Sequence, residues 1–87
     1  MFRVRILDAA AKELKALDRP VADRIVQRLR WLAGAVENTD PEPLKRQLKG
    51  MFKLRVGDYR VIYELLREER TILVHLIGHR SKVYRRR

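Results

Sequence analysis

The sequence predicts an α+β domain with the order β-α-α-β-β-β: an N-terminal strand, an antiparallel helical hairpin and then an antiparallel β-sheet. Apolar and charged side chains alternate at the N-terminus and again beyond residue 51, a pattern typical of half-buried strands. Between these stretches, apolar residues recur every three or four positions, as on amphipathic helices. The length of 87 residues and the hydrophobic content of 46% suit a single domain over residues 1–87 with one modest core.

The N-terminal half accounts for the first strand and both helices. Phe2–Leu7 alternates apolar and basic residues and is predicted to be a strand. Asp8 is expected to cap a first helix, and the apolar face of this helix carries Ala10, Leu14 and Leu17. Pro20 favours the first turn of a second helix, which we expect to end near Val36. The apolar stripe of the second helix, with Trp31 on its flank, consists of Val21, Ile25, Leu29, Leu32 and Val36.

The C-terminal half supplies the remaining strands. Residues 37–43 are acidic and turn-forming and are predicted to be a loop. Residues 44–50 are undecided between a helical turn and an extended approach to the sheet. The tight turn Gly57-Asp58 and the polar turn 67–70 then separate three strands, which are predicted over residues 52–56, 59–66 and 71–77.

Composition limits the compartment in which the protein works. The chain has no cysteine, so neither disulfides nor thiolate metal sites can stabilise it. No apolar run approaches the roughly 20 residues that a membrane span needs. The N-terminus alternates charged and apolar residues, unlike the apolar core of a signal peptide. We therefore expect a soluble cytoplasmic protein without a membrane partner.

Positive charge is concentrated in the second half of the sequence. Residues 1–44 contain 8 Lys and Arg against 7 Asp and Glu, whereas residues 45–87 contain 13 against 4. Nearly all of the formal net charge of +10 therefore belongs to the predicted sheet and tail. A basic surface on a small sheet favours a polyanionic partner, in particular nucleic acid.

The residue types of this half also limit the chemistry. Two-metal phosphoryl transfer needs several converging carboxylates, and the four acids available are Asp58, Glu64, Glu68 and Glu69. No glycine-rich loop precedes a helix to hold a nucleotide. We therefore expect no metal and no cofactor.

Metal-free cleavage of RNA needs other groups. A base must help the 2′-hydroxyl to attack the adjacent phosphate, cations must stabilise the phosphorane-like transition state, and an acid must protonate the leaving 5′-oxygen. Tyr or a desolvated Lys can act as the base, and Arg binds phosphate in a bidentate manner. The candidates for these roles are Lys53, Arg55, Arg60, Arg80 and Tyr84.

Two segments of this half resemble one known family. The run LRVGDYRVIY, within Lys49–Glu64, is similar to the central hairpin of the RelE toxins. The segment Ile77–Arg85, in which VYR follows GHR, resembles the C-terminal motif of the same toxins. The length and the predicted element order match as well. The resemblance is to the RelE/ParE toxin superfamily, whose RelE-type members are ribosome-dependent endoribonucleases. They are the toxins of type II toxin–antitoxin pairs, and they inhibit translation by cutting mRNA in the ribosomal A site.

The resemblance implies roles for individual residues and partners for the chain. Lys53, Arg60 and Arg80 would bind and stabilise the scissile phosphate. Tyr84 would stack on or activate the nucleotide, with Arg55 in support. The further cations expected to bind RNA are Arg46, Lys49, Lys82 and Arg85. The implied partners are a cognate RelB-like antitoxin, the small ribosomal subunit with its ribosomal RNA, and mRNA.

One position departs from the family pattern. Met51 stands where well-studied members carry a second lysine, two residues before the lysine that Lys53 matches. Lys49 and Arg46 are candidates to replace it, and the identity of the base and the acid stays open, with Tyr84 as one candidate base. His79 has a reference pKa near neutrality but lacks a positioned partner in the sequence, and His75 is expected to be structural.

Alternatives to the nuclease hypothesis come from different classes. A ParE-like toxin would poison DNA gyrase without cutting RNA, but such relatives usually lack the tyrosine and the dense basic set of the tail. A non-catalytic nucleic-acid-binding domain would also account for the charge. For single residues, the alternative for Lys53 and Arg55 is an ordinary solvated strand face. For Arg60 it is an exposed ion pair with Asp58 or Glu64.

Overall fold

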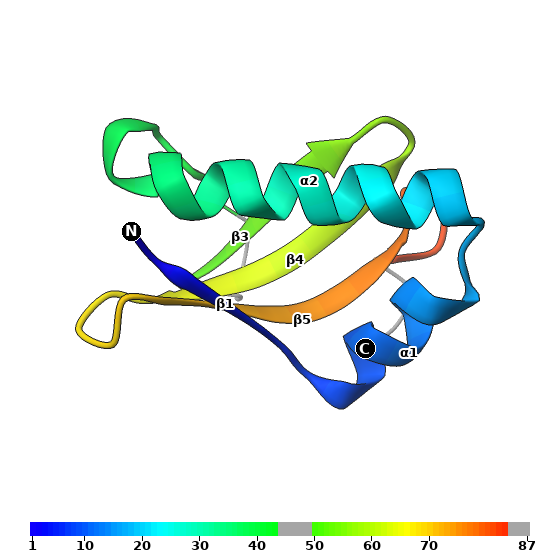
Figure 1. Ribbon diagram of the computed structural model, residues 1–87, viewed down its shortest axis with the longest axis horizontal. Helices are drawn as coiled ribbons and strands as arrows, with labels where there is room; N and C mark the ends of the chain where they lie inside the picture. Colours follow the sequence, from blue (N-terminus) through cyan, green and yellow to red (C-terminus); the bar gives the residue numbers. More distant parts are fainter. Residues whose placement is uncertain (44–49, 84–87) are drawn as a thin grey trace.

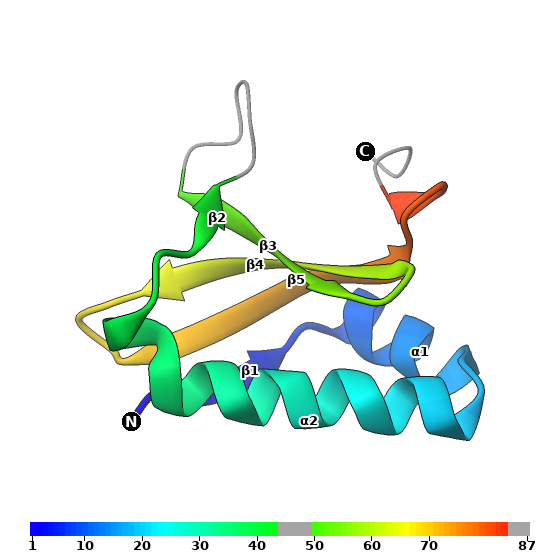
Figure 2. The ribbon, with the colours of Figure 1, turned by 90° about the horizontal axis from the view of Figure 1, so that it is seen from above.

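The computed structural model describes residues 1–43 and 50–83, and its architecture confirms the predicted α+β fold (Figure 1). Both helices lie on the same face of one sheet, and the opposite face is open in the described part of the chain (Figure 2). The elements in chain order are β1 (Arg3–Ile6), α1 (Asp8–Ala16), α2 (Arg19–Ala35), a 3₁₀ turn (Val36–Asn38), β2 (Glu42–Pro43), β3 (Met51–Val56), β4 (Tyr59–Leu66) and β5 (Thr71–His79).

The five strands form one mixed sheet in the order β1-β5-β4-β3-β2. β1 runs parallel to β5, with Arg3 opposite Thr71, and the other pairs are antiparallel. β1 accompanies β5 only as far as Val74. Beyond that point, Oε1 of Glu13 on α1 accepts a hydrogen bond from the backbone N–H of Ile77 at 3.0 Å. The first helix therefore satisfies a backbone donor that the short first strand does not reach.

The helix boundaries follow the sequence with one correction. Asp8 was predicted to cap α1, but the cap position is Leu7 and no side-chain cap bond is made. Asp8 instead lies in the first turn, where its negative charge complements the positive end of the helix dipole. The two-residue connection after Ala16 and the placement of Pro20 in the first turn of α2 agree with the prediction.

The core lies between the helices and the covered face of the sheet. Ile25, Leu29, Leu32 and Val36 of the predicted stripe are all at most 3% exposed, and Val21 packs against them while partly exposed. β3 and β4 contribute alternate residues to the same core, as the period of two requires. On β5 a register shift opposite Ile62 and Tyr63 places the core residues Val74 and Ile77 three positions apart. The buried strand residues facing the helices are Leu54, Val56, Val61, Tyr63, Ile72, Val74 and Ile77.

The segment between α2 and β3 differs from the predicted loop over residues 37–43. It begins within the 3₁₀ turn and ends in β2, where Glu42 pairs with Lys53 and Pro43 with Phe52. Glu and Pro have low strand propensity, so their local sequence gives no sign of a strand. These two residues form a strand because they pair with β3.

The turns and the last strand complete the comparison with the sequence. The tight turn between β3 and β4 is confirmed, with Gly57 at φ +60°, a backbone conformation that favours glycine. β5 extends two residues beyond the predicted end, to His79. Most of the undecided segment 44–50 lies outside the described residues. Among the helices that the structure describes, none has the length and apolar content needed to cross a membrane.

Candidate functional site

The β3–β4 hairpin brings three of the predicted cations to the open face of the sheet. Leu54 and Val56 point into the core, so Lys53 and Arg55, which alternate with them, face the other way. Arg55 lies directly opposite Arg60 on β4, and Lys53 lies opposite Ile62. Like charges directly opposite each other on neighbouring strands repel. The row Arg55–Arg60 is therefore a place where an anion would be stabilising.

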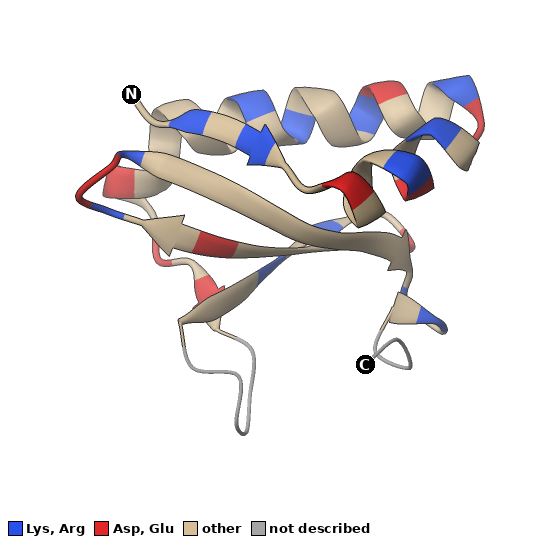
Figure 3. Cartoon of the chain, turned by 90° about the horizontal axis from the view of Figure 1, so that it is seen from below, with Lys and Arg blue, Asp and Glu red and all other residues tan. Residues whose placement is uncertain are grey.

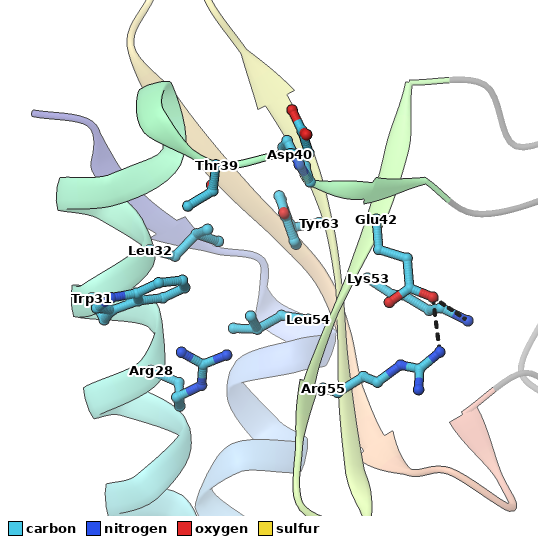
Figure 4. A pocket seen from close by; sticks show the side chains of 11 residues that line it. Arg28, Trp31, Leu32, Thr39, Asp40, Glu42, Lys53, Leu54, Arg55 and Tyr63 are labelled. Atoms are coloured by element: carbon cyan, nitrogen blue, oxygen red, sulfur yellow. Dashed lines mark hydrogen bonds and ion pairs between the residues drawn. The ribbon is translucent and has the colours of Figure 1, made fainter.

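An anion of the chain itself already occupies part of this region. Glu42 Oε2 lies 2.9 Å from Arg55 Nη2 and 3.3 Å from Lys53 Nζ (Figure 4). The hydrogen bond from Arg55, followed by that from Lys53, holds the pKa of the Glu42 carboxyl below its ordinary value of 4.5. The side chain of Lys53 is 20% exposed and that of Glu42 is 44% exposed. The carboxylate is thus ionised at neutral pH and open to solvent.

Arg60 is held by the backbone of its own turn. Its Nη1 donates to the carbonyl oxygens of Gly57 and Tyr59, both at 2.9 Å. The alternative of an ion pair with Asp58 or Glu64 is wrong in the described part of the chain. The Arg60 guanidinium bonds to backbone carbonyls, and Glu64 contacts His75 Nε2 at 3.0 Å. Both bonds of Arg60 use one nitrogen, so its other N–H groups keep a fixed direction and can donate to a phosphate.

A C-terminal turn lies beside the same hairpin. The N–H of Arg80 donates to the carbonyl of Asp58 at 2.8 Å, and that of Lys82 donates to the carbonyl of His79 at 2.9 Å. Nδ1 of His79 accepts from the N–H of Ser81 at 3.1 Å, and its ring packs edge-on against Tyr59 with centroids 5.5 Å apart. This turn brings the exposed residue Arg80 next to the β3–β4 turn, and Lys82, two residues later, is exposed as well. Ser81 is therefore a positioned partner of the His79 ring, and this contact stabilises the C-terminal turn.

Four predicted site residues lie outside the described residues: Tyr84, Arg85, Arg46 and Lys49. Met51 is described and, two residues before Lys53 on β3, it shares the open face. The departure from the family pattern therefore removes a cation from the face that carries Lys53, Arg55 and Arg60.

Two polar side chains near the site have structural roles. His75 bonds to Glu64 across the β4–β5 pair, in agreement with the structural role predicted for it. Tyr63 is 1% exposed, and its ring stacks on Phe52 with centroids 5.7 Å apart. Burial raises the pKa of Tyr63 from 10.0 to about 12, and the ring belongs to the core under the helices and not to the open face. Within residues 1–43 and 50–83, no three His, Cys, Asp or Glu side chains gather as metal ligands.

The positive charge is more widely distributed than the sequence halves suggested. Figure 3 shows Lys and Arg on β1 and along α2 as well as on β3. It also shows acidic residues at β2, on β4 and at the β4–β5 turn. The open face is therefore a local cluster of cations around one carboxylate, and not a uniformly basic sheet.

Known proteins share this sequence pattern and this fold. Residues 4–84 match the family model described as the ParE toxin of the type II toxin–antitoxin system parDE. The chain belongs to the RelE/ParE toxin superfamily. It is 30% identical to the toxin RelE of Mycobacterium tuberculosis over 87 residues, which cover 97% of this chain and 87% of that protein. It is 40% identical to the toxin RelG of the same organism over 45 residues, which span only 52% of either protein.

Solved structures of RelE toxins have the same architecture. The toxin–antitoxin complex RelBE2 of M. tuberculosis matches with a TM-score of 0.80 at 26% identity, over 90% of this chain and 96% of that chain. The isolated RelE toxin of E. coli matches with a TM-score of 0.77 at 20% identity, over 98% and 93% of the two chains. The second likeness shows the fold alone. The chain is accordingly a RelE-like toxin of a toxin–antitoxin system.

Glu42 was not among the site residues that the sequence predicted. It was assigned to an acidic loop, 13 residues from the arginine that it contacts. The sequence contains little indication of this contact, because only the pairing of β2 with β3 brings Glu42 onto the open face. Arg28 and Trp31 of α2 were also not predicted to contact one another, although the guanidinium carbon of Arg28 lies 4.4 Å from the Trp31 ring centroid.

Proposed function

We propose that this toxin is a ribosome-dependent endoribonuclease that cuts mRNA in the ribosomal A site and thereby inhibits translation in the cytoplasm. The observation that carries the proposal is the pair Lys53 and Arg55, which together hold one carboxylate oxygen on the open face. A carboxylate and a phosphate offer similar oxygen geometry to a guanidinium. The same two cations are therefore suited to the scissile phosphate of RNA.

Cleavage would proceed by attack of the ribose 2′-oxygen on the adjacent phosphorus, with loss of the 5′-oxygen. The products are a 2′,3′-cyclic phosphate and a 5′-hydroxyl. Lys53 and Arg60 would stabilise the extra negative charge of the transition state, as preorganised donors do. Arg80, at the neighbouring turn, would contact the same phosphate, and Arg55, Lys82 and the cations outside the described residues would hold the flanking RNA.

Glu42 is the first candidate for the general base. A phosphate that enters this cluster takes over the hydrogen bonds from Arg55 and Lys53 and places its own charge beside the carboxylate. Both changes raise the pKa of Glu42, which makes it a better acceptor for the 2′-hydroxyl proton. Tyr84 is the second candidate for base or acid. Separate replacement of Glu42 and of Tyr84 distinguishes them in the pH dependence of the cleavage rate. Removal of the true base eliminates the limb of the pH–rate profile that reports its ionisation, whereas the other replacement leaves this limb in place.

The proposal includes the partners that a toxin requires. Four matching structures are toxin–antitoxin complexes of the RelBE type, from M. tuberculosis, E. coli, Pyrococcus horikoshii and Methanococcus jannaschii, which supports a RelB-like antitoxin for this chain. The ribosome would be bound through ribosomal RNA by the remaining surface cations, and their contribution would weaken with salt.

A ParE-like gyrase poison is the second candidate function, because the matching family model is that of the ParE toxin. It would need no phosphate site on the sheet. The cluster of Lys53, Arg55 and Arg60 on one open face supports the nuclease instead. A non-catalytic nucleic-acid-binding domain would bind RNA through the same cluster and leave it intact.

Inducible expression followed by mapping of mRNA 5′ ends separates these functions. We expect new ends within translated codons, their loss when translation initiation is blocked, and their loss in Arg60→Ala. The control is Arg3→Ala, which removes an exposed arginine of β1, and it should cut like the wild type. Intact message together with trapped gyrase–DNA complexes would refute the nuclease and support the ParE-like function. RNA binding without new ends would support the binding domain.

A further inference from the structure

Strand β5 carries one residue more than its pairing with β4 requires, and that residue is His75. Ile62 of β4 lies opposite Leu76. Tyr63, the next residue of β4, lies opposite Val74, so His75 falls between two positions of the ladder. A β-bulge of this kind re-aims a side chain, and such bulges are over-represented beside active sites. The bulge therefore marks this part of the sheet as a candidate site.

The imidazole of His75 contacts a carboxylate on the open face. Tyr63 and Leu65 pack on the core side, so Glu64, which alternates with them, faces the other way. Nε2 of His75 lies 3.0 Å from Oε1 of Glu64, and the two side chains are 32% and 38% exposed. The pair is accessible from solvent, and the contact at one oxygen holds the carboxylate in a fixed orientation.

The surroundings of Glu64 differ from those of the cations farther along the hairpin. Met51 on β3 and Leu73 on β5 lie directly opposite Glu64 and are partly exposed. The next cation in this row is Arg5 on β1, two strands away from Glu64. A carboxylate between two apolar side chains disfavours phosphate. It suits an uncharged ring that packs on the apolar groups, one of them a methionine, and donates hydrogen bonds to the carboxylate.

The spacing along the hairpin suits the phosphate and the base of neighbouring RNA. Lys53 lies opposite Ile62, the residue two positions before Glu64 on β4. Two residues advance a strand by about 6.6 Å, so a phosphate held by Lys53 lies one same-face position away from the carboxylate. Only a ribose separates a phosphate from the base of its nucleotide. A base beside the scissile phosphate is therefore brought to Glu64.

We propose that Glu64, oriented by His75, binds a guanine base next to the scissile phosphate. The proposal rests on the proposed function for the position of that phosphate. Guanine presents N1–H and an N2 amino group side by side, which match the two oxygens of a carboxylate, and the oxygen bonded to His75 keeps a second lone pair. Adenine and cytosine place an acceptor nitrogen beside their amino group, and uracil flanks its N–H with two carbonyl oxygens. The carboxylate repels these acceptors, so Glu64 determines specificity and His75 is a positioning residue.

Equilibrium binding of short RNAs tests the site without any cleavage. The probes are labelled oligouridylates in which one central uridine is replaced by guanosine, inosine or adenosine, and inosine lacks the N2 amino group. At one fixed salt concentration, we expect the full chain to bind the guanosine probe about tenfold more tightly than the adenosine probe. The inosine probe should lie between them. Equal affinities, or no binding of any probe, would overturn the proposal.

Variants of the pair give the sharpest contrast. An amide offers one acceptor and one donor and matches adenine, so Glu64→Gln should prefer the adenosine probe several-fold. His75→Leu removes the orienting contact and should reduce the guanosine preference, whereas His75→Gln, which can donate to Glu64, should restore most of it. The control Glu68→Gln removes the same charge at the exposed β4–β5 turn and should keep the wild-type preference. Lower melting temperatures with an unchanged base preference would assign the pair to the scaffold and overturn the site.

The outcomes separate this proposal from the proposed function. Guanosine preference that Glu64→Gln abolishes, in a chain that cuts no RNA, would support the site and refute only the nuclease. On programmed ribosomes, the wild type should cut messages with guanine at one fixed position beside the cut several-fold faster than messages with adenine there. Equal cutting of both, with no change in Glu64→Gln, would overturn the site and leave the nuclease intact.

Discussion

The two faces of the sheet are made by alternate residues of the same strands, yet the two faces have different roles. On the covered face, Leu54 and Val61 pack under the helices and are at most 7% exposed. On the open face, Lys53, Arg55 and Arg60 are close enough in register to repel one another, and a carboxylate from β2 is held among them. The comparison indicates that one face supplies stability and the other supplies an anion site, with little overlap between them.

Ile62 marks the border between these roles. It is 2% exposed although it belongs to the open face, where it lies between Lys53 and Leu76 in the sheet. The methylene stem of a lysine covers apolar surface well while its ammonium stays in solvent. The cations of the open face therefore stand on a small apolar support, which limits how far their side chains can move.

The largest expected effect breaks the covered face. Ile72, on β5, is fully buried between β1 and β4, and Ile72→Ala should lower the free energy of unfolding by about 2–5 kcal/mol, since it leaves a cavity. Arg55→Ala, on the open face, should change it by less than about 1 kcal/mol, because its ion pair is exposed. Urea unfolding of both variants measures the difference. Equal losses would contradict the division between the faces.

The next effect concerns activity alone. Lys53→Met keeps an apolar stem over Ile62 and removes the ammonium. We expect cleavage of ribosome-bound mRNA to fall on the order of 100-fold, the size typical of losing one preorganised donor, with little change in stability. The rate is measured with purified protein and programmed ribosomes. A variant that loses stability but cuts normally would mean that Lys53 belongs to the scaffold.

Alkaline pH tests the covered face without any loss of packing volume. The pKa of Tyr63 is raised from 10.0 to about 12 by burial, so between these values the native state keeps a proton that the unfolded state releases. Stability from this group is complete below pH 10 and is lost as the pH rises through 12, by up to about 2.7 kcal/mol. Urea unfolding near pH 9 and above pH 11 should show a smaller decrease for Tyr63→Phe than for the wild type. Parallel decreases would contradict the assignment.

The smallest effect sharpens the open face. Met51→Lys would restore the cation that well-studied relatives carry, on the same side of β3 as Lys53. Glu64, its partner across the β3–β4 pair, reduces the cost of the added charge. We expect a several-fold faster cleavage of ribosome-bound mRNA and no change in the urea midpoint. A slower enzyme would indicate that this chain has rearranged its site around Met51.

Most of the fold was predictable because its signals are local. Alternation marked the strands, the stripe from Val21 to Val36 marked α2, and Gly57-Asp58 marked the hairpin. The parallel pairing of β1 with β5 and the strand β2 were not predictable, because each depends on a partner distant in the sequence.

The site was predictable only in part for the same reason. Lys53, Arg55 and Arg60 follow from the register of one hairpin, which the sequence defines. Glu42 belongs by sequence to the half with little net charge, but by structure to the cationic cluster of the other half. Residues that are distant in the sequence can be neighbours on the surface, and the charge asymmetry therefore pointed to the cations of the open face without the carboxylate that contacts them.

A single-turnover assay on ribosomes programmed with a short mRNA tests the central claim most directly. The message carries either a ribose or a 2′-deoxyribose at the codon position that is cut, and the products are resolved by end analysis. The account predicts a 2′,3′-cyclic phosphate end from the ribose message and no cut in the deoxy message. It also predicts that Lys53→Met loses the cut and that Arg3→Ala keeps it. Equal cutting of both messages, or a normal rate in Lys53→Met, would contradict it.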